Sequence, residues 1–337
     1  MQISDKIEYV QLPLELGASY CYKDTIFAGD VSDGSFYNST DEGLTWNKLT
    51  QLQDGNGTIR CVFVSSTGSI FVSRDKSGKL MKSINHGQRF EPCLFLSNKK
   101  ASTVWHMAEN TNGWLFVAEY SNLSWNDSCA YIYRSEDDGN TWETIYDNPT
   151  GARHFHFVDI DPYTNNIYAA YGDGKERAGF IRSVDNGDTW ELIGNNKTNP
   201  DIDWQFTSIV FTPNYRILGE DEPIQSDIVR TSDDIHFEKV FIPDSLEQYN
   251  FWAWGRIDND GNVLFGSWTQ HNFLKDTVNE SRGVVYLTQD EGDTWEKLID
   301  FGLQEKHSGT HFASNIFNDE WIFFHSRGSN QRIKIRD

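Results

Sequence analysis

The residues of this chain that are best suited to chemistry lie close together near its middle. Arg153, His154 and His156 stand at the start of an apolar run that is typical of a strand. Imidazoles exchange protons near neutral pH, and a guanidinium binds a carboxylate through paired hydrogen bonds. Elimination beside a uronate needs such groups. A cation neutralises the carboxylate, a base takes the α-proton and an acid protonates the leaving oxygen.

Strand geometry decides whether the two histidines are available for this chemistry. Because alternate side chains of a strand point to one face, His154 and His156 are expected on the same side. If that face borders a channel, both imidazoles are available to a substrate. If it does not, they are core histidines that bond neighbouring backbone groups.

A repeated octapeptide predicts the elements that position these residues. Its pattern is Ser/Thr-x-Asp-x-Gly-x-Thr-Trp, and successive copies start 44 to 57 residues apart, which is the period of a four-stranded propeller blade. The Asp can cap a turn and the Gly supplies a positive φ, so the octapeptide should join the third and fourth strands of a blade. The four close copies begin at Ser39, Ser135, Ser183 and Thr288, and two degraded copies begin at Ser83 and Thr231.

The octapeptide resembles the Asp-box, or BNR repeat, of the sialidase-like β-propellers, and the resemblance covers nearly the whole chain. It implies an all-β fold, a seven-bladed β-propeller with Asp-box turns. We expect a single domain of residues 1–337. The N-terminal run at residues 6–12 should supply the outer strand of the last blade and close the propeller. The family includes hydrolases, lyases and non-catalytic propellers, so the repeat alone assigns no function.

In such a propeller, first strands begin and second strands end at one central face, where a site would form. Six of the nine histidines fall at these positions. The predicted catalytic residues are His106, His154, His156 and Tyr120. The predicted substrate-binding residues are Arg60, Arg74, Arg153, Trp204, Trp254, His271, His311 and Arg327.

These groups resemble those of the propeller polysaccharide lyases, which use His, Tyr and Arg on this face. We therefore predict a lyase that cleaves a uronate-containing glycan by β-elimination. One alternative is an exo-acting hydrolase of sialidase type, although the Phe-Arg-Ile-Pro signature of that family is absent and residues 58–62 are the closest match. The other alternative is a propeller that binds glycans or proteins without catalysis.

Composition limits the classes of partner. The formal net charge of −21 disfavours sequence-independent binding to nucleic acid, and no apolar run approaches the length of a membrane-spanning helix. The expected partner is an acidic poly- or oligosaccharide, and the expected state is a monomer. No cofactor or metal is predicted, because no metal-ligand spacing such as His-Glu-x-x-His occurs. Converging histidines and acids are nevertheless compatible with a divalent cation such as calcium.

Compartment is left open by the sequence. No signal peptide is visible, so we expect a cytoplasmic protein, or a secreted one if this is a mature form. The four cysteines have no Cys-x-x-Cys spacing and are expected to be buried thiols: Cys21, Cys61, Cys93 and Cys129.

Overall fold

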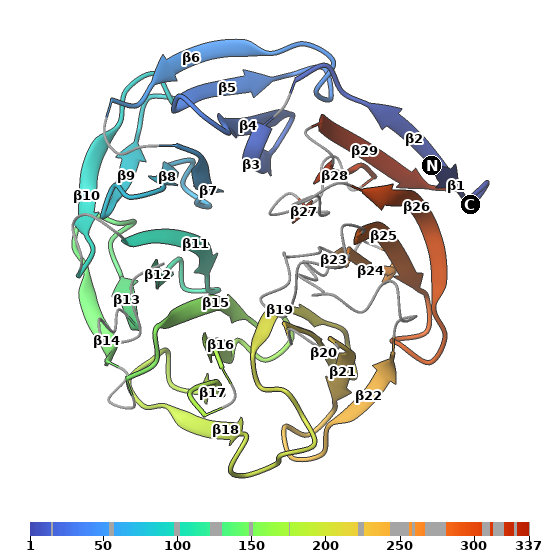
Figure 1. The fold of residues 1–337 in the computed structure, drawn as a ribbon. Coiled ribbons are helices and arrows are strands. Elements are labelled where there is room, and N and C mark those ends of the chain that lie inside the picture. The colour runs from blue at the N-terminus through green and yellow to red at the C-terminus, as the bar shows by residue number, and fades with distance from the viewer. Residues whose placement is uncertain are drawn as a thin grey trace. The chain divides into compact units, whose positions relative to one another are not determined.

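A computed structural model describes most of the chain, and every described segment is strand, turn or loop. The described residues are 1–14, 16–53, 57–97, 102–121, 130–147, 151–174, 176–221, 226–242, 256–257, 260–266, 281–304, 311–312, 320–326 and 329–336. They form seven antiparallel sheets and contain no helix, as the sequence predicted (Figure 1). Accordingly, no described segment is an apolar helix long enough to cross a membrane.

The chain divides into two compact units, and Leu16–Trp204 forms the unit with four sheets, or blades. In each blade the four strands pair in chain order, and the first strands of successive blades are neighbours. The strands of the four blades are β3 (Leu16–Tyr22), β4 (Thr25–Asp30), β5 (Ser35–Ser39) and β6 (Asn47–Gln51); β7 (Ile59–Val64), β8 (Ile70–Arg74), β9 (Lys79–Ser83) and β10 (Glu91–Phe95); β11 (Ser102–Glu109), β12 (Leu115–Ser121), β13 (Tyr131–Ser135) and β14 (Glu143–Asp147); β15 (His154–Ile160), β16 (Ile167–Gly172), β17 (Gly179–Ser183) and β18 (Glu191–Asn195).

The other unit combines Met1–Glu15 with Gln205–Asp337 and holds three blades. Its strands are β19 (Phe206–Phe211), β20 (Arg216–Glu220), β21 (Ile228–Thr231) and β22 (Glu238–Phe241); β23 (Arg256–Ile257), β24 (Val263–Gly266), β25 (Ser281–Thr288) and β26 (Glu296–Gln304); β27 (His311–Phe312), β28 (Ile322–Ser326) and β29 (Ser329–Ile335); and the N-terminal β1 (Gln2–Ile3) and β2 (Ile7–Gln11).

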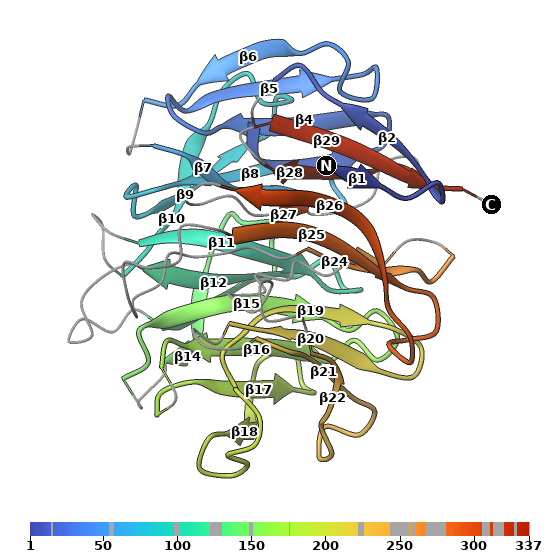
Figure 2. The same cartoon turned by 45° about the vertical axis from the view of Figure 1, so that its right-hand side comes forward.

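The N-terminal strands complete two of these blades. β2 pairs antiparallel with β29 as the outer strand of the last blade, which confirms the prediction for residues 6–12 (Figure 2). β1 pairs with β26 and adds a fifth strand to the preceding blade, which the sequence did not predict.

The octapeptide turns join the third and fourth strands of their blades, as predicted. In the copy at 135–142, the Ser135 hydroxyl accepts a hydrogen bond from the Gly139 amide at 2.7 Å. The Asp137 carboxylate accepts bonds from the Thr141 amide and hydroxyl at 2.8 and 2.7 Å. Asp138 and Gly139 both have positive φ, of 57° and 79°. The sequence predicted only the glycine. The non-glycine residue before it also adopts the left-handed conformation.

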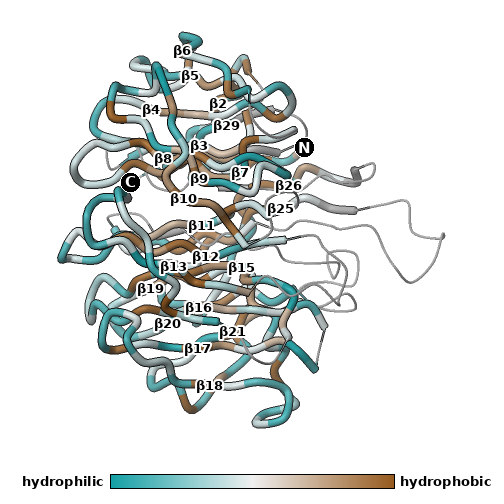
Figure 3. The backbone as a smooth tube through the Cα atoms, turned by 90° about the vertical axis from the view of Figure 1, so that its left-hand side faces the viewer, coloured by the Kyte–Doolittle hydropathy of each residue, from teal (hydrophilic) through white to brown (hydrophobic). Residues whose placement is uncertain are grey.

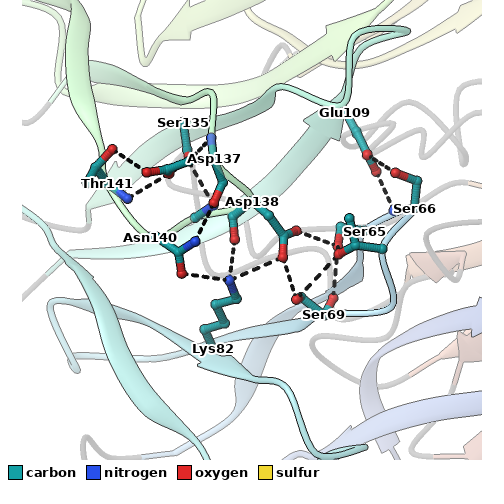
Figure 4. A network of polar contacts seen from close by, with 12 residues as sticks. Ser65, Ser66, Ser69, Lys82, Glu109, Ser135, Asp137, Asp138, Asn140 and Thr141 are labelled. Atoms are coloured by element: carbon teal, nitrogen blue, oxygen red, sulfur yellow. Dashed lines mark hydrogen bonds and ion pairs between the residues drawn. The ribbon is translucent and has the colours of Figure 1, made fainter.

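The turns also bind the blade before them. Lys82, on β9, donates its ammonium to the backbone carbonyl of Asp138 and to the side chain of Asn140, at the turn of the following blade. The Asp138 carboxylate in turn accepts the hydroxyls of Ser65 and Ser69 at 2.8 and 2.6 Å (Figure 4). One turn therefore contacts both β9 and the turn between β7 and β8 of its neighbour.

This inter-blade contact is repeated. In each case a basic residue on the third strand of one blade donates to the backbone carbonyl of the positive-φ residue in the next turn, and to a side chain two residues further on. The same contact runs from Arg134 to Asn186 and Asp188, and from Arg230 to Glu291 and Asp293.

The hydrophobic core lies between adjacent blades. One cluster joins Phe116 and Ile132 to Phe155, Val158 and other residues of the next blade, all of them buried. Figure 3 shows hydrophobic residues along the strands and hydrophilic residues at many of the turns. Because adjacent blades within a unit pack their faces against each other, their strands carry near-continuous apolar runs.

Candidate functional site

The candidate site forms where β15 and β16 pair at one end of their blade. His154 pairs with Gly172 in this ladder, so Arg153, just before β15, and Asp173, just after β16, are brought side by side. The Asp173 carboxylate accepts the Arg153 guanidinium through Oδ2. Oδ1 of the same carboxylate lies 3.4 Å from Nε2 of His154 and 3.4 Å from Nε2 of His156. We call these four residues the Asp173 cluster.

Both histidines are buried and point to the same carboxylate, and the sequence predicted only that they share one face. A β-bulge contributes to this arrangement, because His156 has no partner in the register between Phe155 and Phe157. Bulges re-aim side chains and are common beside active sites. The first strands of the two preceding blades, β7 and β11, also contain register shifts, and the residues at those shifts include Arg60, Trp105 and His106.

His154 is fixed by a contact with the preceding blade. Its Nδ1 lies within hydrogen-bonding distance of the backbone carbonyl of Ser121. Since a carbonyl oxygen only accepts, Nδ1 carries the proton and Nε2 presents its lone pair to Asp173 in the neutral ring. The His154 residue is 1% exposed, and burial lowers the pKa of its imidazole.

Asp173 is the charged centre of the cluster. Burial by itself raises the pKa of this carboxyl, but the electrostatic interactions with His154 and His156 outweigh it and leave the pKa below its ordinary range. The backbone of Asp173 is also unusual, with a φ of 107°. A non-glycine residue in such a conformation stores on the order of 1–3 kcal/mol of strain, and strained residues of this kind cluster at functional sites.

Aromatic rings extend the cluster. The Tyr120 ring stacks on Trp105 with centroids 3.6 Å apart and lies 4.0 Å from the His154 ring. Tyr120 is 7% exposed. The structure thus brings four sequence-predicted residues into one place: Tyr120, Arg153, His154 and His156.

His106 belongs to a different set of contacts. Its Nδ1 lies 2.7 Å from the backbone carbonyl of Val158, and its Nε2 lies 3.8 Å from the Asp159 carboxylate. These partners sit further along β15 than the two histidines of the cluster. His106 therefore connects β11 to β15, and its catalytic role stays a prediction.

Other predicted substrate-binding residues of this unit make structural contacts. Arg60 pairs with Asp75 through hydrogen bonds of 2.9 and 3.0 Å. Arg74 is buried and donates to the backbone carbonyls of Leu52 and Gly57. Trp204 is also buried, and its indole donates to a backbone carbonyl at 2.8 Å. Arg74 and Trp204 therefore act first as parts of the core.

The remaining predicted residues belong to the other unit. His311 starts β27 and pairs in register with His325. Trp254, His271 and Arg327 lie outside the described residues.

Asp173 was not among the site residues predicted from the sequence. It stands at the end of a second strand, which is the position that suggested the other site residues, and it is directly followed by Gly174. That position was the available signal, but only the pairing of β15 with β16 shows which histidines it meets. A carboxylate of the preceding blade, Glu119, is buried and accepts hydrogen bonds from Ser97, Ser102 and Tyr133.

The chain matches no protein-family model and no curated protein sequence. Solved structures do resemble it. A catalytically inactive virginiamycin B lyase from Staphylococcus aureus, solved with quinupristin, gives a TM-score of 0.68 at 14% identity, over 98% of this chain and 99% of its own. YCF48 bound to D1 peptide gives 0.65 at 14% identity, over 99% and 98%.

The fold is a seven-bladed β-propeller. An ancestral GH74 enzyme is also similar, with a TM-score of 0.64 at 16% identity over 95% of this chain and 45% of its own. At these identities the likeness concerns the fold alone. Propellers similar to this one thus serve varied functions, and the function must be argued from the site.

Proposed function

We propose that this propeller is carbohydrate-active and cleaves a uronate-containing glycan by β-elimination. The observation that carries the proposal is the meeting of Tyr120, Arg153, His154 and His156 around Asp173. These residues supply the three kinds of group that the reaction needs. The imidazoles and the phenol can transfer protons, and the guanidinium can neutralise a carboxylate.

Charge favours this assignment of Arg153. The chain is acidic overall, with a formal net charge of −21, so a polyanion needs a local cation to bind. About a fifth of the Arg153 side chain is exposed, at 22%. A uronate carboxylate would bind this exposed part, beside the carboxylate of Asp173. Binding there would place the α-carbon of the uronate near the imidazoles and Tyr120.

The octapeptide turns support membership of the Asp-box propellers, in which a sialidase-type hydrolase is the second candidate. The contacts of the acidic side chains near the predicted central face favour a hydrolase less than a lyase. A glycosidase needs two carboxylates free to act across the scissile bond. Here Asp75 pairs with Arg60, and Glu119 accepts three side-chain donors. Asp30 caps its own turn by accepting the amides of the two residues Ser32 and Asp33.

An assay with a panel of acidic polysaccharides tests the proposal. β-Elimination creates a conjugated, unsaturated uronate, so ultraviolet absorbance should rise together with reducing ends. Reducing ends without the absorbance would instead indicate a hydrolase. Saturable binding without any product would indicate a binding propeller, and either result would overturn the proposal.

Variants locate the activity. Replacement of His156 with alanine should abolish turnover, because every role proposed for this imidazole is lost. His86→Asn is the matched control, since His86 is exposed in an octapeptide turn and its positive φ of 59° suits asparagine. The control should keep wild-type turnover.

A further inference from the structure

We propose that His154, His156 and Asp173 form a binding site for one divalent transition-metal ion, with Zn²⁺ as the best-suited ion. The inference rests on ligand geometry and does not require the reaction proposed above, although a bound ion would occupy the two imidazoles that this reaction uses. Each of these three residues offers one possible ligand atom. The three atoms all lie within 4.8 Å of one another, and among the described residues this is the group of His, Cys, Asp or Glu side chains that could share an ion.

The distances fit a shared ion better than hydrogen bonds. Each imidazole Nε2 lies 3.4 Å from Asp173 Oδ1, which is beyond the usual N–H···O range of about 2.7–3.2 Å. With Zn–N and Zn–O bonds of about 2.0–2.2 Å, neighbouring ligand atoms of a tetrahedral site stand about 3.3–3.5 Å apart. The two nitrogen–oxygen separations therefore match edges of such a site.

His154 carries the decisive observation. Its Nε2 is buried and makes no hydrogen bond to the described residues, although it is aimed at Asp173. Leaving a buried polar atom without a partner costs about 1–3 kcal/mol. The proton of the ring lies on Nδ1, which faces the Ser121 carbonyl. Metal-binding histidines have the same arrangement, with one nitrogen on the ion and the other donating to a carbonyl or carboxylate.

Asp173 is oriented in a matching way. Arg153 binds Oδ2, which leaves Oδ1 as the atom that faces both imidazoles. Ligating carboxylates are commonly held by such an outer hydrogen bond. The strained φ of 107° at Asp173 fixes the carboxylate where the two imidazoles point.

The donor set selects the class of metal. Two imidazole nitrogens and one carboxylate oxygen suit Zn²⁺ and related transition metals, whereas Ca²⁺ takes six to eight oxygen ligands. The proposed ion is therefore different from the calcium ion that the sequence analysis considered compatible with these residues. Three protein ligands leave a coordination position for water or substrate. When the ion is bound, the imidazoles are ligands, and the proton transfers of the proposed reaction fall to Tyr120.

Metal binding is measured on the full-length, tag-free chain after removal of metals with a chelator. Equilibrium dialysis against Zn²⁺ with elemental analysis should give one ion per wild-type chain. The melting temperature should rise with Zn²⁺ and stay unchanged with Ca²⁺, because an ion that binds only the folded state stabilises it. No stoichiometric Zn²⁺ in the folded wild type would overturn the proposal.

Variants assign the ligands. Asp173→Asn and His154→Gln keep the approximate shape of the side chains, and each should weaken Zn²⁺ binding by at least about tenfold. The His86→Asn control should bind like the wild type. If the wild type and both variants bind Zn²⁺ equally, the ion binds at another site and the proposal is overturned. If circular dichroism shows that the variants do not fold, the visible spectrum of the Co²⁺-loaded wild type decides. Intense bands support a four-coordinate site, and their absence overturns it.

Discussion

Arg134 donates a hydrogen bond of 2.7 Å to the backbone carbonyl of Asn186, a residue of the octapeptide turn in the next blade. Asn186 is the non-glycine residue of that turn that has a positive φ, of 59°. This conformation turns its carbonyl toward the neighbouring blade. The octapeptide is thus more than a hairpin turn, because three of its copies each bind the blade before them. We therefore expect these contacts to stabilise the packing of adjacent blades.

Loss of this contact should lower the free energy of unfolding. Arg134→Ala removes a charge-assisted hydrogen bond from a side chain that is only 10% exposed, so we expect a loss of about 1.5–3 kcal/mol. Arg89→Ala is the control, because Arg89 forms its ion pair with Glu91 in solvent, and it should change stability by less than about 1 kcal/mol. Urea unfolding measures both, and equal losses would contradict the role of the inter-blade contact.

Stability should fall at acid pH because of the turn carboxylates. Hydrogen bonds from Thr45 lower the pKa of Asp41 below its ordinary value of 3.8, and the carboxylates of the other close copies are lowered too. The folded state then binds fewer protons than the unfolded state. The contribution is complete above the ordinary pKa and is lost as the pH falls through the lower, folded value.

Asp41→Asn provides the check on this acid sensitivity. Asparagine cannot titrate, so the difference in unfolding free energy between pH 6 and pH 3 should be smaller in the variant than in the wild type. Asp24→Asn, at an exposed position outside the octapeptides, should leave the difference unchanged. An unchanged pH dependence in Asp41→Asn would refute the assignment.

Tyr120→Phe separates proton transfer from packing. Phenylalanine keeps the stacking on Trp105 and His154 but lacks the hydroxyl, so turnover should fall by about 10²- to 10⁴-fold while the melting temperature stays near that of the wild type. Tyr163→Phe, at an exposed turn between β15 and β16, is the control for the loss of a phenol. Wild-type turnover in Tyr120→Phe would remove this residue from the mechanism.

The thiols of Cys61 and Cys93 should be unreactive in the folded protein. Burial raises the pKa of Cys61 and of Cys93 to about 12, so almost no thiolate exists at pH 8. A thiol reagent followed by peptide mapping should label both residues only after unfolding in urea. Rapid labelling of Cys61 in the native protein would contradict its burial. Cys21 is also buried, as the sequence predicted, whereas Cys93 is half-buried and Cys129 lies outside the described residues.

Local patterns made the fold predictable. The octapeptide carries its own hydrogen bonds within eight residues, so its copies and their spacing predicted the blades and the joined strands. Alternation within β15 likewise placed His154 and His156 on one face. These predictions depend only on residues close in sequence, whose geometry is set by the backbone.

The hydrogen-bond partners of the site residues could not be predicted from the sequence. Arg74 is held by the carbonyls of Leu52 and Gly57, and the His154 ring by the carbonyl of Ser121, in a different blade. Every residue has a backbone carbonyl, so the residue types do not show which carbonyls accept hydrogen bonds from the site residues. Arg60, Arg74 and Arg153 therefore looked equivalent in the sequence, although only Arg153 contacts the carboxylate that faces the two histidines.

Mass spectrometry of the products from an acidic polysaccharide tests the central claim most directly. Elimination adds no water across the cleaved bond, so the account predicts a new non-reducing-end fragment that is lighter than the hydrolysis product by one water. Wild-type protein should form this fragment, and His156→Ala should not. Fragments with the full mass of the hydrolysis product would contradict the account, as would an unchanged polysaccharide.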